Sequence, residues 1–382
     1  MVQPAAPLTA AGDLHRQPTL VPPVDVAQLG PVLGVETSCD ETATAVVDAS
    51  GIRANVVSSQ IPIHRRYGGV VPEIASRHHL ELVLPVIDTA LNEAGLTLDQ
   101  LAGVAVTRGP GLIGALLVGL AAAKAVAFTQ QLPLVGVHHS AGHVYANFLA
   151  YPQLQPPVVC LIVSGGHTEL VYIPAHGHFE LLGQTRDDAA GEAFDKIARV
   201  LGLPYPGGPA LEALASSGDP QAVHLPRALL PETGHGRSDP DDPDSISLDF
   251  SFSGLKTATL QVLSSPGAPS AADLAASFQQ AIVDVCVTKT IAAAHRAHVH
   301  TVLLAGGVAA NQALRQQLAA ACHEQGLQLF APPLSLCTDN GAMIAAAGRY
   351  LLAAGQRAGW DLDADPNLPL TTRWYSKPDP ST

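Results

Sequence analysis

Two segments of similar design, about 125 residues apart, constrain the fold of this 382-residue chain more than any other feature. Each runs from an apolar strand through a short polar turn into a second apolar strand. The segments are PVLGVETSCDETATAVVD (31–48) and VVCLIVSGGHTELVYI (158–173). Apolar runs bounded by turn residues are typical of β-hairpins. Two such hairpins predict a duplicated domain, although the sequences of the segments have little in common.

The stretches between and after the hairpins predict α/β architecture. Three of them read as strand, polar turn and helix, at residues 103–128, 132–150 and 299–322. CTDNGAMIAAAGRYLLAAG (337–355) predicts a C-terminal helix that is capped by Thr338 or Asp339. The apolar stretch 114–128 contains Lys124 and is rich in Ala and Gly, which favours a core helix over a membrane span.

Composition limits the class of protein. The net charge of −13 disfavours binding of nucleic acid by overall charge, so an RNA substrate needs a local basic patch or a partner subunit. The five cysteines are scattered, without a CxxC pair, which favours a reducing cytoplasm over a disulfide framework. Residues 1–30 lack the basic and apolar regions of a signal peptide, and we expect a disordered extension there. The proline-rich stretch 216–247 predicts a surface insertion, and the residues after 358 a loose tail.

Three glycine turns follow predicted strands: GPGL (109–112), SGG (164–166) and AGG (305–307). Backbone N–H groups at such turns can bind anions, although a tight turn needs glycine for steric reasons alone. Three turns at the carboxyl ends of strands favour a phosphate or nucleotide cleft. The absence of GxxxxGK[ST] and GxGxxG disfavours P-loop and Rossmann proteins. In DDAAGEAFDK (187–196), Glu192 and Lys196 have the spacing of a helical surface pair.

HHSAGH (138–143) is the candidate metal-binding motif. On a helix, His139 and His143 would share one face and reach a single ion, although this spacing also arises by chance. Ser140 stands where a zinc protease needs its glutamate, which disfavours proteolysis. Asp339, at the start of the C-terminal helix, is the candidate third ligand; its alternative role is to cap that helix. We expect His138 not to bind.

Nine motifs occur in the order found in one known family. They are LGVETSCDETATAVVD, GGVVPEIASRHHL, GPGLIGALLVGL, HHSAGH, VSGGHTELV, DDAAGEAFDKIARVLGLPYPGGPALE, FSFSGLKTA, AGGVAANQALR and CTDNGAMIA. Together they resemble the bacterial TsaD family of tRNA adenosine threonylcarbamoyltransferases. The resemblance extends from about residue 32 to 350 and leaves out the N-terminal extension, the acidic loop near 236–247 and the tail.

The resemblance implies an α/β protein with the actin-like ATPase fold of sugar kinases and Hsp70, in which a ligand cleft separates two βα lobes. We expect an N-terminal lobe at 31–150, a C-terminal lobe at 151–337, a helix at 338–357 that packs back at the cleft, and a tail at 358–382. The implied reaction moves threonylcarbamoyl from threonylcarbamoyl-AMP to the N6 amine of adenosine 37 in tRNAs that read ANN codons. A TsaC-like synthase would make the adenylate. A TsaB-like paralogue and a TsaE-like ATPase are the implied partners of a cytoplasmic complex without membrane contact.

Roles carry over residue by residue from the family. His139, His143 and Asp339 match the ligands of one Fe²⁺ or Zn²⁺ per chain, and Asp40 and Glu41 match residues of the transfer step. The positions matching the adenylate-binding set are Ile162, Val163, Ser164, Gly165, Gly166, Asp195, Gly208, Glu212 and Asn311. One departure is Ala141, which stands where many relatives have the Glu of HxEGH; metal binding is still expected without it.

The segment HRRYGGVVPEIASRHH (64–79) is the candidate tRNA contact, because it concentrates Arg65, Arg66, Arg77 and three histidines. An ordinary solvated loop is the alternative. For the whole chain, two other classes stay open: a small-molecule kinase of the same fold, and a non-catalytic paralogue or binding module. The histidine pair with Asp339 disfavours the kinase, because such kinases hold Mg²⁺ on carboxylates and water. Retention of these residues and of the SGG turn disfavours the binding module.

Overall fold

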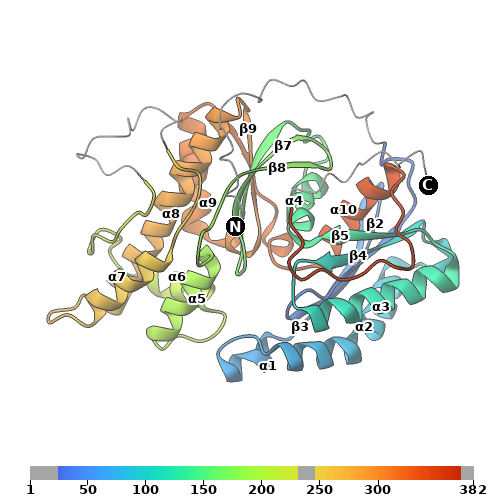
Figure 1. The fold of residues 1–382 in the computed structure, drawn as a ribbon, viewed down its shortest axis with the longest axis horizontal. Coiled ribbons are helices and arrows are strands. Elements are labelled where there is room, and N and C mark those ends of the chain that lie inside the picture. Colours follow the sequence, from blue (N-terminus) through green and yellow to red (C-terminus); the bar gives the residue numbers. More distant parts are fainter. Residues whose placement is uncertain (1–24, 231–245, 371–382) are drawn as a thin grey trace, which may run out of the picture.

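The computed structural model describes residues 25–230 and 246–370. Residues 1–24, 231–245 and 371–382 lie outside the described residues, and with them most of the expected extension and of the acidic loop. Two five-stranded sheets dominate the architecture (Figure 1). The first sheet contains β1 (Val32–Glu36), β2 (Glu41–Asp48), β3 (Gly51–Ser59), β4 (Gly103–Gly109) and β5 (Leu134–His138). The second contains β6 (Val158–Val163), β7 (Thr168–Ala175), β8 (His178–Gln184), β9 (Thr301–Ala305) and β10 (Gln328–Phe330).

The two sheets repeat one topology. The order β3-β2-β1-β4-β5 in the first sheet corresponds to β8-β7-β6-β9-β10 in the second. In both sheets the first strand pairs antiparallel with the second and parallel with the fourth. The two hairpins of the sequence are therefore the equivalent pairs β1–β2 and β6–β7. Every residue of β1 and β6 is buried, as expected of apolar strands that have both faces covered.

Helices cover the outer face of each sheet (Figure 1). On the first lobe, α2 (Pro72–Ala94) packs against β2 and β3, and α3 (Ile113–Gln130) packs against β4 and α2. On the second lobe, α8 (Ala271–Arg296) packs against β6, and α9 (Gln312–Glu324) packs against α8 and β10. By length and composition, α3 is the one helix of the described chain that could cross a membrane. Its contacts with β4 and α2 are those of a layer helix in an α/β lobe.

Several shorter elements complete the two lobes. The helices are α1 (Ile61–His64), α5 (Ala190–Val200), α6 (Gly207–Ala215) and α7 (Ser253–Leu263). The 3-10 turns are η1 (Arg65–Tyr67), η2 (Leu98–Gln100), η4 (Gly307–Ala310) and η5 (Leu334–Leu336). α5, α6 and α7 all belong to the second lobe and pack around α8.

Two helices form a layer between the sheets. α4 (His139–Ala150) follows β5 and packs on β6 and β9 of the other lobe, while α10 (Gly341–Ala353) follows β10 and packs on β1 and β4. The two helices also pack against each other. Residues of α4, α10 and both sheets share one apolar core, so each lobe's last helix covers the other lobe's sheet. This exchange brings the N-terminal ends of α4 and α10 together.

Two segments outside the sheets are more tightly packed than the sequence indicates, and for one of them the expectation is wrong. Residues 358–370 are not a loose tail: they lie along β4 and β5, with a backbone hydrogen bond from Asp365 to Arg108 and with Leu370 buried in the interlobe core. Part of the insertion is also packed, because Leu225 is fully buried and Arg227 pairs with Asp284 of α8 at 2.7 Å. Apolar side chains at these positions secure segments that look like surface loops in the sequence.

Candidate active site

A cavity of about 430 Å³ lies where loops of the two lobes meet. All three glycine turns contribute to its wall, through Gly111, through Ser164 to Gly166, and through Gly307. Gly306 has a φ of +93° and packs directly on the backbone of Val163, an approach that a side chain would block. The convergence of three turns on one cavity agrees with the ligand cleft that their positions after strands predict.

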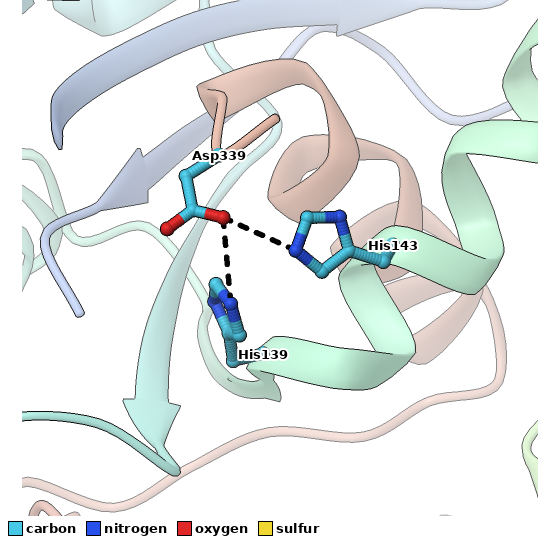
Figure 2. Close-up of side chains that lie close together, drawn as sticks. All are labelled: His139, His143 and Asp339. Atoms are coloured by element: carbon cyan, nitrogen blue, oxygen red, sulfur yellow. Dashed lines mark hydrogen bonds and ion pairs between the residues drawn. The ribbon is translucent and has the colours of Figure 1, made fainter. Parts of the chain in front are cut away.

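His139 and Asp339 line this cavity, and His143 lies beside them (Figure 2). Oδ1 of Asp339 lies 3.1 Å from Nε2 of His143 and 3.5 Å from Nε2 of His139. The two imidazole rings, one turn apart on α4, are nearly perpendicular. All three ligand atoms lie within 4.8 Å of one another. His143 and Asp339 are 196 residues apart in the chain, and they meet because α4 and α10 begin close together.

The start of each helix is secured by a neighbour of the triad. Asn340 caps α10, because its side-chain oxygen accepts a hydrogen bond from the Met343 amide at 2.9 Å. The expected cap, Thr338 or Asp339, is therefore wrong, and the Asp339 carboxylate stays available to the histidines. His138 caps α4 through the Ser140 amide and donates its Nε2–H to the Leu368 carbonyl at 2.9 Å. Both ring nitrogens of His138 thus have hydrogen-bond partners outside the triad.

Glu36 is a site residue to which the sequence reasoning assigned no role. It is fully buried at the end of β1, and its Oε2 lies 3.2 Å from Nδ1 of His139. Thr107 and the Ser38 amide also donate to this carboxylate, both at 2.5 Å. Burial opposes its ionisation, but the charge and hydrogen bond of His139 outweigh burial and lower the pKa of Glu36. In the sequence, the one sign of this role is that Glu36 is the single carboxyl at the end of an otherwise apolar strand.

The donor set fits a divalent cation. Ligands bonded at 2.0–2.1 Å in a tetrahedral shell lie about 3.3 Å apart, close to the observed distances from Asp339 to the two histidines. Glu36 holds the Nδ1–H of His139, so Nε2 of His139 can donate its lone pair to an ion. Burial opposes protonation of His139, yet the charges of Asp339 and Glu36 raise its pKa to about 9. The site therefore attracts positive charge, and a bound cation would replace that proton.

Asp40 and Glu41 line the opposite wall of the cavity. Oδ2 of Asp40 accepts a hydrogen bond from the Tyr205 hydroxyl of the second lobe at 3.3 Å. Burial and the charge of Asp339 raise the pKa of Asp40, while hydrogen bonds from Cys39 and Tyr205 oppose that shift. Oε1 of Glu41 accepts from Ser59 at 2.8 Å, and burial raises the pKa of Glu41 to about 8. At pH 7 Glu41 is therefore mostly protonated.

The raised pKa of Glu41 predicts that Glu41→Gln stabilises the protein at alkaline pH. The folded state binds this proton more tightly than the unfolded chain does, so stability falls as the pH rises from about 4.5 to about 8. Glutamine, which cannot ionise, avoids this loss. We expect the free energy of unfolding of the variant to exceed that of the parent by about 1–3 kcal/mol at pH 8.5 and to match it at pH 4.5. Urea unfolding at the two pH values measures this, and an equal difference at both would contradict the assignment.

The residues expected to bind the adenylate divide into two groups. Seven line the cavity: Ser164, Gly165, Gly166, Asp195, Gly208, Glu212 and Asn311. Ile162 and Val163 do not, because β6 directs their side chains into the apolar cores on its two faces. The role that the resemblance implies for Ile162 and Val163 therefore stays a prediction that concerns their backbone atoms.

Three of the polar lining residues already serve the fold. Asp195 accepts a hydrogen bond from the Gly207 amide at the start of α6, at 2.7 Å. Glu212 accepts from the Gln312 amide at the start of α9, also at 2.7 Å, and Asn311 caps that helix. Each carboxylate thus accepts a hydrogen bond from the amide at the start of a helix. Lys196 pairs with Asp188 and Glu192, which makes DDAAGEAFDK the site of a surface ion-pair cluster.

Two further lining residues, Tyr205 and His167, were missed in the sequence. Burial, together with the charges of His139 and His143, lowers the pKa of His167 to about 4, so its imidazole is neutral. Ala141 lies fully buried in the interlobe core. Neither Tyr205 nor His167 belongs to a spacing pattern that marks a site.

The fold and the site define a two-lobed α/β protein of the actin-like ATPase class, with a possible metal-binding triad in its interlobe cleft. Residues 51–346 match the family model TsaD, tRNA N6-adenosine threonylcarbamoyltransferase. The chain is 58% identical over 346 residues to the enzyme of that name from Symbiobacterium thermophilum, covering 89% of this chain and 97% of the relative. It is 56% identical over 345 residues to that of Geobacillus thermodenitrificans, covering 89% and 96%. The chain belongs to the TsaD family of tRNA N6-adenosine threonylcarbamoyltransferases.

Solved structures agree with the fold class. Full-length HypF in its phosphate- and nucleotide-bound form aligns with a TM-score of 0.55 at 13% identity, over 85% of this chain and 46% of that one. HypF from T. kodakarensis aligns with the same TM-score at 16% identity, over 86% and 48%. At this identity the likeness concerns the fold alone. The family membership leaves the small-molecule kinase and the non-catalytic module without support.

Proposed function

We propose that this protein transfers the threonylcarbamoyl group from threonylcarbamoyl-AMP to the N6 amine of adenosine 37 in tRNAs that read ANN codons, and releases AMP. One observation carries the proposal: a chain of this transferase family places His139, Asp339 and Asp40 on the wall of one cavity, with His143 beside Asp339. The cavity volume, about 430 Å³, is in the range of small-ligand sites.

The cavity wall suggests how the donor lies. The turns at 109–112, 164–166 and 305–307 present backbone N–H groups suited to the phosphate of the AMP moiety. The carboxylates of Asp195 and Glu212, which line the cavity, suit hydroxyl donors such as those of a ribose. This placement directs the threonylcarbamoyl end toward the triad and Asp40.

The reaction needs positioning and proton transfer, because the mixed anhydride is already activated. The N6 amine forms a bond with the carbamoyl carbon, the bond from that carbon to the phosphate oxygen breaks, and AMP leaves with the electron pair. Asp40 takes the proton that the amine loses, since Glu41 is mostly protonated at pH 7. Tyr205 holds the Asp40 carboxylate in place from the opposite lobe.

His139, His143 and Asp339 would hold one Fe²⁺ or Zn²⁺, since two imidazole nitrogens and one carboxylate oxygen suit either ion. Such an ion supplies Lewis acidity and a positive charge for the oxygens of the donor. Glu36 keeps the His139 ring in the orientation that directs Nε2 to the ion.

This role of Glu36 predicts the effect of Glu36→Gln. The amide cannot accept from Thr107, the Ser38 amide and His139 all at once, so the His139 ring loses its fixed orientation. We expect metal affinity to fall about 10–100-fold, measured by competition with a chelator. Glu180→Gln, a change at a half-buried position of β8 outside the cavity wall, is the matched control and should leave the affinity unchanged. Equal affinities in both variants would remove Glu36 from the site.

The partners extend the proposal. tRNA is the acceptor, a TsaC-like synthase supplies the adenylate, and a TsaB-like paralogue and a TsaE-like ATPase complete a cytoplasmic complex. The outer helices of the first lobe expose Leu80 and Leu84 on α2 and Leu117 on α3. Exposed apolar side chains on two packed helices support contact with a protein partner. Mixing the purified chains and measuring the mass of the complex tests this.

The experiment that tests the function is transfer of labelled threonylcarbamoyl to an ANN-reading tRNA, with and without the partners. We expect labelled tRNA and stoichiometric AMP with the full set. A tRNA that has guanosine at position 37 is the control and should stay unlabelled. Absence of labelled product with all components present would refute the function.

A further inference from the structure

The cleft has a basic rim that is built from both lobes. Arg65, Arg66 and Tyr67 form η1 on the first lobe, directly after α1, whose first residue Ile61 lines the cavity. On the second lobe, Arg199 is exposed in the last turn of α5. The two lobes meet here. Nε of Arg65 donates to the Tyr205 carbonyl at 3.0 Å, and Arg199 donates to the Gly68 carbonyl at 2.5 Å.

The arginines of this rim form no ion pair within the described residues, although the charge of Arg199 acts on the nearby Asp195. In the described part of the chain, Arg65, Arg66 and Arg199 have no carboxylate within 4 Å, whereas Arg53, Arg186 and Arg227 each form an ion pair. This contrast is informative in a chain of net charge −13. An acidic protein that leaves three neighbouring arginines unpaired concentrates its positive potential at that place.

The rim also presents an aromatic ring. Tyr67 has 59% of its surface exposed, between Arg66 and the left-handed Gly68 that closes the turn. The turn is held from below by the buried His64, which contacts Gln60 at 3.2 Å and accepts from the Val71 amide at 3.3 Å. The tyrosine and the arginines therefore extend from a fixed support. Exposed aromatics between arginines are typical of surfaces that bind single-stranded RNA.

We propose that Arg65, Arg66 and Tyr67 of the first lobe and Arg199 of the second form the docking surface for the single-stranded RNA around the reacting adenosine. This inference rests on the proposed function. The arginines bind backbone phosphates, and Tyr67 stacks on an unpaired base, while the target base enters the cavity beside Tyr205. Because Arg65 and Arg199 come from different lobes and already touch the opposite lobe, RNA that binds both also holds the cleft closed.

The test compares charge-reversal variants in the complete system with its partners. Arg65→Glu and Arg199→Glu should each raise the Kd for an ANN-reading tRNA about ten-fold at 0.1 M salt, and each should lower the slope of log Kd against log salt by about 1. Tyr67→Ala should raise the Kd about five-fold or more, and Tyr67→Phe should not. Arg357→Glu, with the same charge change just beyond the far end of α10, is the control and should behave as the parent.

AMP binding and partner association separate the possible outcomes. The surface predicts that both stay unchanged in the arginine variants. Unaltered tRNA affinity and salt slope would overturn the surface. Weakened AMP binding with an unchanged salt slope would show that the arginines only join the lobes. Loss of partner association would show that the rim binds a protein partner. Either result would overturn the inference. A parent protein that binds tRNA through this rim but transfers no threonylcarbamoyl would refute the proposed function instead.

Discussion

Asp339→Ala is expected to lower both stoichiometric metal binding and threonylcarbamoyl transfer at least about 100-fold. The Oδ1 atom of Asp339 contacts both His139 and His143, so its loss removes the anionic ligand between the two imidazoles. The same loss removes the negative charge that, with Glu36, raises the pKa of His139 to about 9. Elemental analysis of the purified variant and the labelled transfer assay measure the two effects.

The fold should survive this substitution, because α10 is capped by Asn340 and not by Asp339. Unfolding by urea should therefore be cooperative in the variant. Asp361→Ala, an exposed change in the C-terminal segment, is the matched control and should keep full metal content. If Asp339→Ala bound the metal as tightly as the parent, the triad would not be the metal site.

Asp40→Asn is expected to reduce the rate of transfer about 100-fold or more, while metal content and AMP binding stay unchanged. Asparagine keeps an oxygen that can accept from the Tyr205 hydroxyl, so the contact between the lobes is retained. It cannot accept the proton of the N6 amine. Single-turnover rates with saturating tRNA isolate this step from binding.

Glu41→Gln is the comparison that distinguishes the two carboxyls. With a pKa of about 8, Glu41 is already mostly protonated at pH 7, and Ser59 donates to its Oε1. We therefore expect less than a ten-fold loss of rate in this variant. If Glu41→Gln lowered the transfer rate more than Asp40→Asn, Glu41 would be the base and Asp40 a positioning residue.

Local pattern accounts for much of the fold. The hairpins at 31–48 and 158–173 and the strand–turn–helix segments are visible because strand and helix periodicities are local properties of the chain. The duplicated topology follows from the repetition of the hairpin. Packing is not local, which explains the wrong expectation for 358–370. That segment is polar and proline-containing, yet the Leu368 carbonyl and the buried Leu370 attach it to the first lobe.

The candidate site shows the same division. His139 and His143 are detectable because four residues make about one helical turn. Asp339 is a candidate because it precedes a helix. Glu36 and Tyr205 carry no comparable spacing signal, since the first reaches His139 from the end of β1 and the second reaches Asp40 from the other lobe. Whether a charged residue is buried depends on the residues that pack over it, and these are distant in the sequence.

The sequence by itself determined the fold class, the family, the two histidines on one helical face and the three glycine turns after strands. These depend on neighbours within a few residues, or on motifs that retain their order. Only the tertiary structure decided that α4 and α10 exchange lobes, so that their first residues place Asp339 between the histidines. It also decided that Asn340 caps α10, that Ile162 and Val163 belong to the core, and that Arg199 joins Arg65 at the rim. The physical reason is that the apolar faces of these helices pack between the two sheets. This packing fixes the distances between residues that are far apart in the sequence, which local sequence patterns cannot predict.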